Sequence, residues 1–355
     1  MKIDQIKIFF ILPSLKAGGA ERVISFVSQN IDKDKFKPYL LVAGFEKDSV
    51  YDVSNIEVIY FNKSRILTAM PYFFKYIQKY KPDIVLSSIA HVNKAMATIS
   101  PIFKNVKFIG REATVLGKNK NSKINKVSLV SLIPNSFNKL DALICQSEDM
   151  ANDMIDNFNV SREKVFVINN PISNLPDVKK ISKNGKHKRF ITVGRLTNIK
   201  GHLRILDVLS LLKEPFTYTI IGDGELKDEI FNKAKELNLI DKIDFIPYTK
   251  KVYDFLSQHD LFLQGSYVEG FPNALLESCV VGTPVLAFKA PGGTKEIIEE
   301  DVNGFMVENK KEYLSILQSD LNFKPEDVRE SVYKKFNQQI IINQYENLFI
   351  KIYSK

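Results

Sequence analysis

The chain has 355 residues, of which 45% are hydrophobic, and this is enough for two ordinary domains with a core each. No segment offers the roughly 20 consecutive apolar residues that span a bilayer, and the two cysteines and four histidines are not spaced as metal ligands, so we expect neither a transmembrane helix nor a zinc site. The net charge of +9 is uneven: residues 1–170 carry 24 Lys/Arg and 16 Asp/Glu (+8), whereas residues 171–355 carry 26 Lys/Arg and 25 Asp/Glu (+1). The basic first half favours an anionic partner, which we expect to be a membrane surface more than a nucleic acid. The alternative is that the chain is merely rich in lysine.

The first half of the chain alternates short apolar runs with helix-forming stretches. The opening run is broken by Asp4 and Lys7, which is typical of a first strand and not of a signal peptide. We predict strands at residues 6–12, 38–42, 56–61, 83–87, 107–110, 140–146 and 164–171, and helices at about 20–30, 67–80 and from Ser147 onward. Repeated strand–helix units predict a doubly wound parallel sheet, so residues 1–171 form a first Rossmann-like domain.

The second half repeats this pattern after a polar segment. Residues 172–188 have the composition of a linker. Strands are expected at residues 189–195, 218–222, 243–246, 261–264 and 284–287, which predicts a second Rossmann-like domain over residues 189–337. Residues 338–355 are amphipathic and predict a final helix. Cys145 and Cys279 are interpreted as buried apolar residues of a cytoplasmic protein.

Two glutamates eight positions apart, Glu269 and Glu277, mark the end of the strand at 261–264. Residues 265–267 turn the chain, and Pro272 suits the first turn of a helix because its missing N–H would be unpaired there. We therefore expect Glu269 on an exposed loop at the carboxyl end of a strand, where open α/β sheets bind ligands, and Glu277 on the helix that follows. Taken alone, either residue could equally be a solvated surface charge.

Two cations, Arg195 and Lys200, flank the loop after the first strand of the second domain. A guanidinium offers several planar hydrogen bonds to phosphate oxygens and an ammonium adds a mobile point charge, so together they could neutralise a diphosphate. The alternative for this pair alone is two surface cations.

Glycine-rich turns also precede helices, at Gly18-Gly19, at residues 222–224 and at Gly292-Gly293. Such turns let a backbone approach a phosphate or sugar closely, and the last one could form an anion-binding nest. None is the G-x-G-x-x-G dinucleotide fingerprint. Each could also be a structural turn, and for residues 222–224 that reading is at least as good as ligand contact.

In this order and spacing, the motifs resemble those of the retaining glycosyltransferases of family 4. Residues 268–277 (VEGFPNALLE) resemble the family's E-x7-E motif, residues 194–201 (GRLTNIKG) its G-R-L-x-x-x-K-G element, and residues 18–22 (GGAER) its glycine loop. The resemblance covers most of the chain and is strongest from residue 189 to 304. It implies the GT-B fold: two Rossmann-like domains face a central cleft, and the final helix crosses back to the first domain.

The resemblance also implies roles for single residues. Glu269 would be the catalytic carboxylate, which positions the sugar hydroxyls or stabilises the developing oxocarbenium charge. Glu277 would bind the ribose, and Gly18 and Gly19 would line the cleft. The nucleotide-sugar donor would be bound by these two glutamates together with Arg195, Lys200, Gly270, Phe271, Asn273, Gly292 and Gly293. One departure stands out: many members carry a histidine after the strand equivalent to residues 107–110, where this chain has Arg111-Glu112-Ala113. His91 lies on an earlier loop, so we assign no catalytic histidine.

These observations together predict a retaining, metal-independent and cofactor-free glycosyltransferase. Its donor would be a nucleotide-sugar, with UDP expected as the nucleotide, and its acceptor a glycan or lipid-linked glycan in surface polysaccharide or glycoconjugate synthesis. The alternatives are another GT-B activity, such as a sugar-nucleotide epimerase or a glycan phosphorylase, or a basic nucleic-acid-binding module. The last is disfavoured because the basic residues are not interleaved with aromatics in a recognisable motif, so we expect no nucleic-acid partner.

A basic and apolar segment suggests where a membrane would be met. Residues 111–139 contain six basic residues and one acid, Glu112, and a helix over residues 122–133 would place lysines beside apolar side chains. Such a helix can lie in a bilayer interface, with its lysines near anionic headgroups. We therefore expect a cytoplasmic protein that binds peripherally to an anionic membrane; an ordinary amphipathic helix packed on its own sheet is the alternative.

Overall fold

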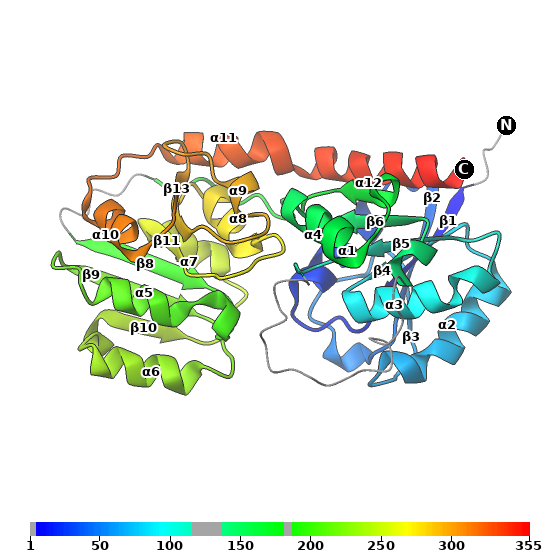
Figure 1. The fold of residues 1–355 in the computed structure, drawn as a ribbon, viewed down its shortest axis with the longest axis horizontal. Helices are drawn as coiled ribbons and strands as arrows, with labels where there is room; N and C mark the ends of the chain where they lie inside the picture. The colour runs from blue at the N-terminus through cyan, green and yellow to red at the C-terminus, as the bar shows by residue number, and fades with distance from the viewer. Residues whose placement is uncertain (1–4, 116–135, 181–186) are drawn as a thin grey trace. The chain divides into compact units, whose positions relative to one another are not determined.

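The computed structural model describes residues 5–115, 136–180 and 187–355. The chain divides into two compact units: unit 1 contains Met1–Ser173 and Gln338–Lys355, and unit 2 contains Asn174–Asn337. Each unit is built on one parallel sheet with helices on both faces (Figure 1). The predicted linker, residues 172–188, begins at this division, and β8 of unit 2 starts at its last residue, Lys188.

Unit 1 has a seven-stranded sheet in the order β3-β2-β1-β4-β5-β6-β7, with every neighbouring pair parallel. Its strands are β1 (Ile6–Leu12), β2 (Phe36–Val42), β3 (Glu57–Tyr60), β4 (Ile84–Ser88), β5 (Lys107–Arg111), β6 (Ala142–Cys145) and β7 (Val165–Val167). Its helices are α1 (Gly19–Asn30), α2 (Ile66–Tyr80), α3 (Ala90–Ile99), α4 (Glu148–Phe158) and α12 (Gln338–Tyr353). Strands buried on both faces read as continuous apolar runs, and this is why the run at 6–12 predicted β1 to the residue.

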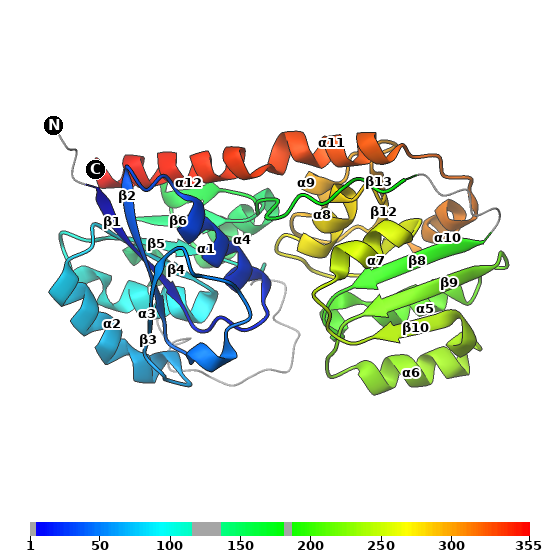
Figure 2. The same cartoon turned by 180° about the vertical axis from the view of Figure 1, so that it is seen from behind.

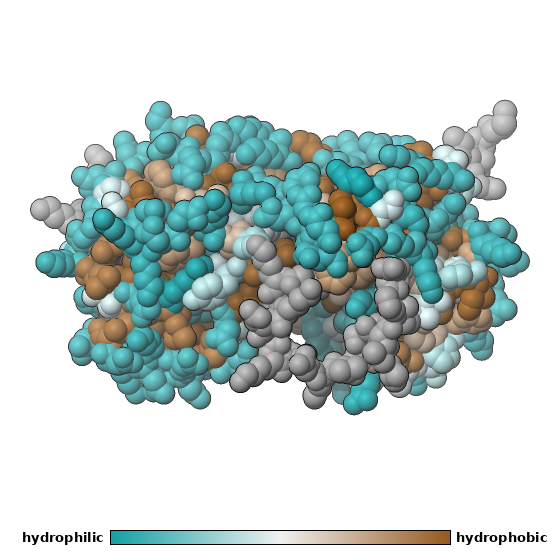
Figure 3. Space-filling model, in the orientation of Figure 1, coloured by the Kyte–Doolittle hydropathy of each residue, from teal (hydrophilic) through white to brown (hydrophobic). Residues whose placement is uncertain are grey.

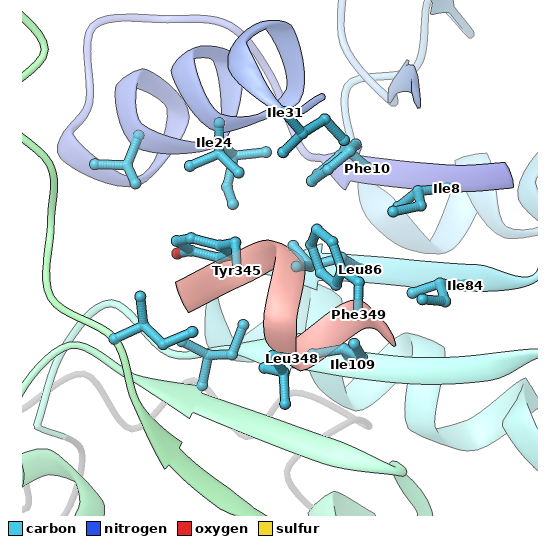
Figure 4. Packing of buried hydrophobic residues seen from close by; sticks show 14 of the residues in the cluster. Ile8, Phe10, Ile24, Ile31, Ile84, Leu86, Ile109, Tyr345, Leu348 and Phe349 are labelled. Atoms are coloured by element: carbon cyan, nitrogen blue, oxygen red, sulfur yellow. The ribbon is translucent and has the colours of Figure 1, made fainter. Parts of the chain in front are cut away.

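The last helix of the chain completes the core of unit 1. Tyr345, Leu348 and Phe349 of α12 lie against apolar side chains of the central strands and of α1 (Figure 4). The Phe349 ring meets Phe10 of β1 and Phe36 of β2 edge-on, with centroids 6.1 and 5.9 Å apart. Thus residues more than 300 positions apart in the sequence share one hydrophobic core.

Unit 2 has a six-stranded parallel sheet in the order β10-β9-β8-β11-β12-β13. Its strands are β8 (Lys188–Val193), β9 (Phe216–Ile221), β10 (Ile243–Ile246), β11 (Leu261–Gln264), β12 (Val285–Phe288) and β13 (Gly304–Val307). Its helices are α5 (His202–Leu209), α6 (Lys227–Glu236), α7 (Val252–Gln258), α8 (Asn273–Val280), α9 (Thr294–Ile297), α10 (Lys310–Gln318) and α11 (Pro325–Phe336). Helices α5, α6 and α10 cover one face, and α7, α8 and α9 cover the other, as Figure 2 shows from behind.

In both sheets the winding reverses at the first strand. The strand β1 pairs with β2 on one side and β4 on the other, and β8 pairs likewise with β9 and β11. At such a switch point the loops at the carboxyl ends of the two central strands diverge, and this is where open α/β sheets bind ligands. The switch point of unit 2 therefore brings the loop after β8 beside the loop after β11.

The described surface is mostly hydrophilic on the face shown in Figure 3, with hydrophobic residues in small groups. Over the described ranges, no helix combines the length and the apolar character needed to cross a membrane. The helix predicted at residues 122–133, with the flanking Lys118 and Lys120, lies outside the described residues.

Candidate functional site

The loops after β8 and β11 contain the cations and the glutamate that the sequence singled out. The loop after β8 includes a short 3-10 turn, η7 (Asn198–Lys200), and leads through Gly201 into α5. The loop after β11 runs from Gly265 to Pro272, where α8 begins. Pairing of Leu261 with Phe190 places β11 directly beside β8, so the two loops meet at one edge of the sheet.

Lys200 and Glu269 form an ion pair at this edge. Lys200 Nζ donates to Glu269 Oε1 at 2.7 Å and to Oε2 at 2.9 Å, and Ser266 Oγ donates to Oε1 at 2.5 Å. Glu269 is only 7% exposed, so the expectation of an exposed loop residue was wrong. The three hydrogen bonds from Lys200 and Ser266 meet the requirement that a buried carboxylate be paired and hydrogen-bonded.

Arg195 is the exposed cation that the sequence placed on the loop after β8. Its side chain is exposed, and among the described residues it takes part in no ion pair. Its backbone is held by the buried Leu196, whose N–H donates to Asp223 O at 2.9 Å. Gly222 and Gly224 permit this contact: a Cβ at Gly224 would lie 2.5 Å from Leu196 O, and one at Gly222 would lie 2.0 Å from the carbonyl before Arg195. In the structure these glycines serve close backbone packing.

His202, the first residue of α5, was not identified from the sequence. It is 1% exposed, and its Nε2 lies 3.3 Å from Arg195 O. Burial lowers the pKa of His202 to about 4, so the ring is neutral at pH 7 and can donate to that carbonyl. Its Nδ1 has no hydrogen-bond partner among the described residues. His202 and Ser266 both contact residues that the sequence singled out: His202 lies beside Arg195 O, and Ser266 donates to Glu269. Both lie just outside the matching motifs at 194–201 and 268–277, and nothing in the sequence marks them.

The E-x7-E segment differs from expectation at the start of its helix. Pro272 is the N-cap of α8 and not part of its first turn, which begins at Asn273. Glu277 lies on α8 and is 8% exposed. The ring of Phe271 is buried and packs edge-on against Phe336 of α11, with centroids 5.3 Å apart. This places the aromatic ring of the motif in the core of unit 2.

The Gly292-Gly293 loop packs against the Glu269 loop. Gly293 N–H donates to Gly270 O at 2.8 Å, and Glu269 N–H donates to Pro291 O at 2.9 Å. A Cβ at Gly292 would lie 1.9 Å from Glu269 O, and one at Gly293 would lie 2.5 Å from the Phe271 ring. The glycines are therefore required by the close approach of two loops, and in this structure the Gly293 N–H is already occupied and not open to an anion.

Unit 1 presents its own polar residues at the carboxyl end of its sheet. Gly18 is the N-cap of α1, and its N–H and carbonyl both bond to Tyr51 Oη, at 2.8 and 2.7 Å. Gly19 is the first residue of α1, and His91 is an exposed residue of α3. Within the described ranges, none of these residues hydrogen-bonds to Arg111 or Glu112.

Arg111 and Glu112 are both buried, and Asn93 Nδ2 donates to Arg111 O at 2.9 Å as well as to Glu112 Oε1. Arg111 Nε donates to Tyr345 Oη of α12 at 3.0 Å, and its Nη2 donates to Asn170 Oδ1 at 2.6 Å. Glu112 accepts from Asn93 Nδ2 at 2.6 Å. Burial raises the pKa of Glu112 to about 7, although Asn93 and nearby cations oppose the shift. These hydrogen bonds account for the burial of the two residues, and the sequence contains no signal for it beyond the departure from the family pattern.

Among the described residues, no group of three or more His, Cys, Asp or Glu is arranged to hold a metal ion.

Comparison with known proteins agrees with this arrangement. The model "Glycosyltransferase Family 4" matches residues 17–173, and "Glycosyl transferases group 1" matches residues 175–319. The chain is 27% identical over 324 residues to N-acetylgalactosamine-N,N'-diacetylbacillosaminyl-diphospho-undecaprenol 4-alpha-N-acetylgalactosaminyltransferase of Campylobacter jejuni, and the match covers 85% of this chain and 86% of the relative.

Two solved structures share the fold. The apo form of the lipopolysaccharide outer core galactosyltransferase WaaB aligns with a TM-score of 0.79 at 17% identity, over 97% of this chain and 99% of the other. HepE of Anabaena, in complex with UDP and glucose, aligns with a TM-score of 0.79 at 19% identity, over 98% and 100%. The two family models together span nearly the whole chain, and both sheets have the expected doubly wound order, so the chain belongs to the family 4 glycosyltransferases of GT-B fold.

Proposed function

We propose that this glycosyltransferase is a retaining, metal-independent enzyme that takes its sugar from a UDP-sugar. The acceptor would be a glycan or lipid-linked glycan of a surface polysaccharide or glycoconjugate. The observation that carries the proposal is the Lys200–Glu269 pair beside the exposed Arg195 at the switch point of unit 2. The pair supports the proposal because a carboxylate is suited to sugar hydroxyls and cationic side chains are suited to a diphosphate.

The main chemical task is to stabilise the diphosphate as it leaves. Arg195 is exposed and unpaired within the described part of the chain, so it can bind phosphate oxygens without losing another partner. Lys200 must share its ammonium between Glu269 and the phosphate. Because negative charge on the leaving group grows along the reaction, these cations bind the transition state more strongly than the ground state, and that difference accelerates transfer.

Glu269 and Glu277 have separate tasks in this proposal. Glu269 would accept hydrogen bonds from the sugar hydroxyls and stabilise positive charge that develops at the anomeric carbon. Glu277, eight residues on, would accept hydrogen bonds from the ribose. No cofactor takes part, since the nucleotide-sugar is itself a substrate.

The names of related proteins support the substrate classes. HepE was solved with UDP and glucose, and the Campylobacter relative acts on a diphospho-undecaprenol-linked acceptor. A screen of nucleotide-sugars with mass detection of the product tests the donor, and NMR of the new anomeric proton tests retention. Hydrolysis or transfer with no nucleotide-sugar, or a product of inverted configuration, would contradict the proposal.

A peripheral membrane contact is part of the proposal, and α2 of unit 1 supports it. Residues 62–82 contain five basic residues and no acid. On the exposed side of α2, Leu67 and Tyr72 are 54% and 41% exposed, and Lys75 and Lys79 are exposed beside them. Apolar side chains flanked by lysines without acids fit an anionic lipid surface, where each lysine contributes about 1 kcal/mol.

A further inference from the structure

We propose that Arg204 is a positioning residue for sugar transfer: it holds the turn that carries Ser266 and Glu269, and thereby fixes the carboxylate at the donor site. The proposal rests on the role proposed above for Glu269. It adds a residue that lies outside the family motifs and, among the described residues, has no hydrogen bond or ion pair with Glu269.

The guanidinium of Arg204 binds the backbone of that turn. Arg204 is the third residue of α5, and its Nε donates to Gly265 O at 2.5 Å while its Nη2 donates to Ser266 O. Two consecutive carbonyls thus accept from one edge of a rigid planar group. Charge-assisted hydrogen bonds of this paired kind are strong and fix geometry as well as energy.

Two aromatic rings restrain the guanidinium further. Its Cζ lies 4.1 Å from the centroid of Tyr267 and 4.0 Å from that of Phe288 at the end of β12. Among the described residues Arg204 takes part in no ion pair. The guanidinium therefore interacts with the carbonyls of the turn and with the two aromatic rings, and not with a neighbouring carboxylate.

Backbone contacts from the segment before and at the start of α5 also hold the turn. Gly265 lies so close to the loop before α5 that a Cβ on Gly201 would be 1.8 Å from Gly265 O. The N–H of Tyr267 donates to Ile199 O at 2.8 Å. The turn is thus held from residues 199–204, the same segment that contains Lys200.

A displacement of the turn would reach the reacting group directly. Ser266 Oγ donates to Glu269 Oε1 at 2.5 Å, so a shift of Ser266 moves or frees the carboxylate. Misplacement of a reacting group by about 1 Å costs on the order of 100-fold in rate. Loss of Arg204 should therefore lower turnover more than donor binding, which Arg195 and Glu277 would still support.

Arg329 provides a matched control for a merely structural role. It is also half-buried, and it also binds two backbone carbonyls: its Nε donates to Val280 O at 2.6 Å and its Nη2 to Pro176 O. Neither carbonyl belongs to the Glu269 loop. Truncating either arginine should lower the free energy of unfolding by a similar amount. The two variants then differ in whether the lost hydrogen bonds hold the turn that carries Ser266 and Glu269.

The test compares Arg204→Met, Arg204→Lys and Arg329→Met in the full chain. Amide hydrogen exchange is followed in a peptide that covers residues 265–269, and kcat and donor KM are measured with the UDP-sugar that wild-type protein uses. For Arg204→Met we expect faster exchange in that peptide and a fall in kcat of about tenfold or more, with KM changed less than about threefold. Arg204→Lys keeps the charge, so its exchange at residues 265–269 and its kcat should lie between those of Arg204→Met and wild type. Arg329→Met should change neither the exchange at residues 265–269 nor kcat.

The proposal is overturned if Arg204→Met leaves kcat within about twofold of wild type, or if Arg329→Met lowers kcat equally. The proposal would also be contradicted if Arg204→Met and Arg329→Met both exchanged faster throughout unit 2 and did so to the same extent at residues 265–269. If wild-type protein transfers no sugar from any donor, the proposed function has failed separately. In that case the exchange of residues 265–269 still decides whether Arg204 holds the turn.

Discussion

Lys200 Nζ lies 2.7 Å from Oε1 and 2.9 Å from Oε2 of Glu269, so the expected phosphate ligand and the expected sugar ligand neutralise each other. Both residues come from loops at the switch point of one sheet, although 69 positions separate them in the chain. A donor diphosphate would compete with Glu269 for the ammonium. Donor binding and carboxylate placement are therefore linked through Lys200.

Replacing Glu269 by Gln should lower kcat by on the order of 100-fold, because the amide keeps the shape but removes the negative charge that stabilises the donor sugar. Initial rates with a UDP-sugar and acceptor measure this. Glu308→Gln is the matched control, since Glu308 also pairs with a lysine, Lys289, at 2.6 Å but is exposed and outside the site. A Glu269→Gln enzyme that keeps more than about a tenth of wild-type kcat would sink the catalytic role.

Replacing Arg195 by Ala should weaken binding of UDP by about 10–100-fold, the loss expected for charged hydrogen bonds, and change binding of uridine little. Isothermal calorimetry with both ligands measures the difference. Lys213→Ala is the control, because Lys213 is an exposed cation in the loop before β9, at the opposite edge of the sheet. Equal losses for UDP and uridine would refute the assignment of Arg195 to the diphosphate. Lys200→Ala should show the same preference.

Chelation of divalent metal should leave transfer unchanged, because the proposed site stabilises the diphosphate with cationic side chains. Rates measured with and without EDTA, after extensive dialysis, test this. Full inhibition that added magnesium or manganese reverses would show that a metal ion takes part in the reaction.

The stability of the protein should depend on the ionisation of Glu112. Burial raises its pKa from the ordinary value of 4.5 to about 7, so between these pH values the folded state keeps a proton that the unfolded state has lost. Stability should therefore fall as pH rises from about 4.5 to 7, by about 3 kcal/mol at most. Lys94, Arg111 and Asp153 also act on this carboxyl.

Glu112→Gln resembles the protonated form and can still accept from Asn93, so it should lose this pH dependence. Urea unfolding of wild type and variant from pH 4.5 to 8 isolates the contribution of Glu112, since all other groups are shared. The variant should become the more stable of the two as pH rises. Parallel stability curves would show that Glu112 ionises in the folded state as it does in the unfolded chain.

Lys75→Gln combined with Lys79→Gln should weaken binding to anionic vesicles by about 2 kcal/mol, or roughly 30-fold, and spare UDP affinity. Co-sedimentation with vesicles containing phosphatidylglycerol measures this, and added salt should weaken wild-type binding because exposed charges are screened. Lys227→Gln with Lys235→Gln on α6 is the control, since both lysines are exposed on unit 2. No wild-type binding at low salt would end the membrane hypothesis in favour of a soluble acceptor.

Much of the fold could be predicted because parallel strands that are buried on both faces have continuous apolar sequences. The predicted bounds of β10, β11 and α12 agree with the structure within a residue or two. Helix α3 was missed, because it starts after Ile89, whose φ of 80° is a conformation that a β-branched residue rarely adopts. Local sequence preference gives no signal for such a start.

The candidate site could be predicted residue by residue but not as a set of contacts. Glu269, Arg195 and Lys200 stand in motifs with a known order. The ion pair between two of them depends on β11 lying beside β8, which is set by the crossover of the whole sheet. The inward position of Glu269 depends equally on Ser266 and on the packing of the Gly292 loop, and neither is encoded at positions near Lys200.

The position of α12 has a consequence for how the chain is made. Synthesis on the ribosome runs from the amino terminus, so the strands of unit 1 emerge first, yet Tyr345 and Phe349, which fill the core against them, emerge last. All of unit 2 is translated in between, and its core contains only its own residues. Unit 2 can therefore fold to completion while unit 1 still lacks α12, so the unit that is synthesised second can be the first to complete its core.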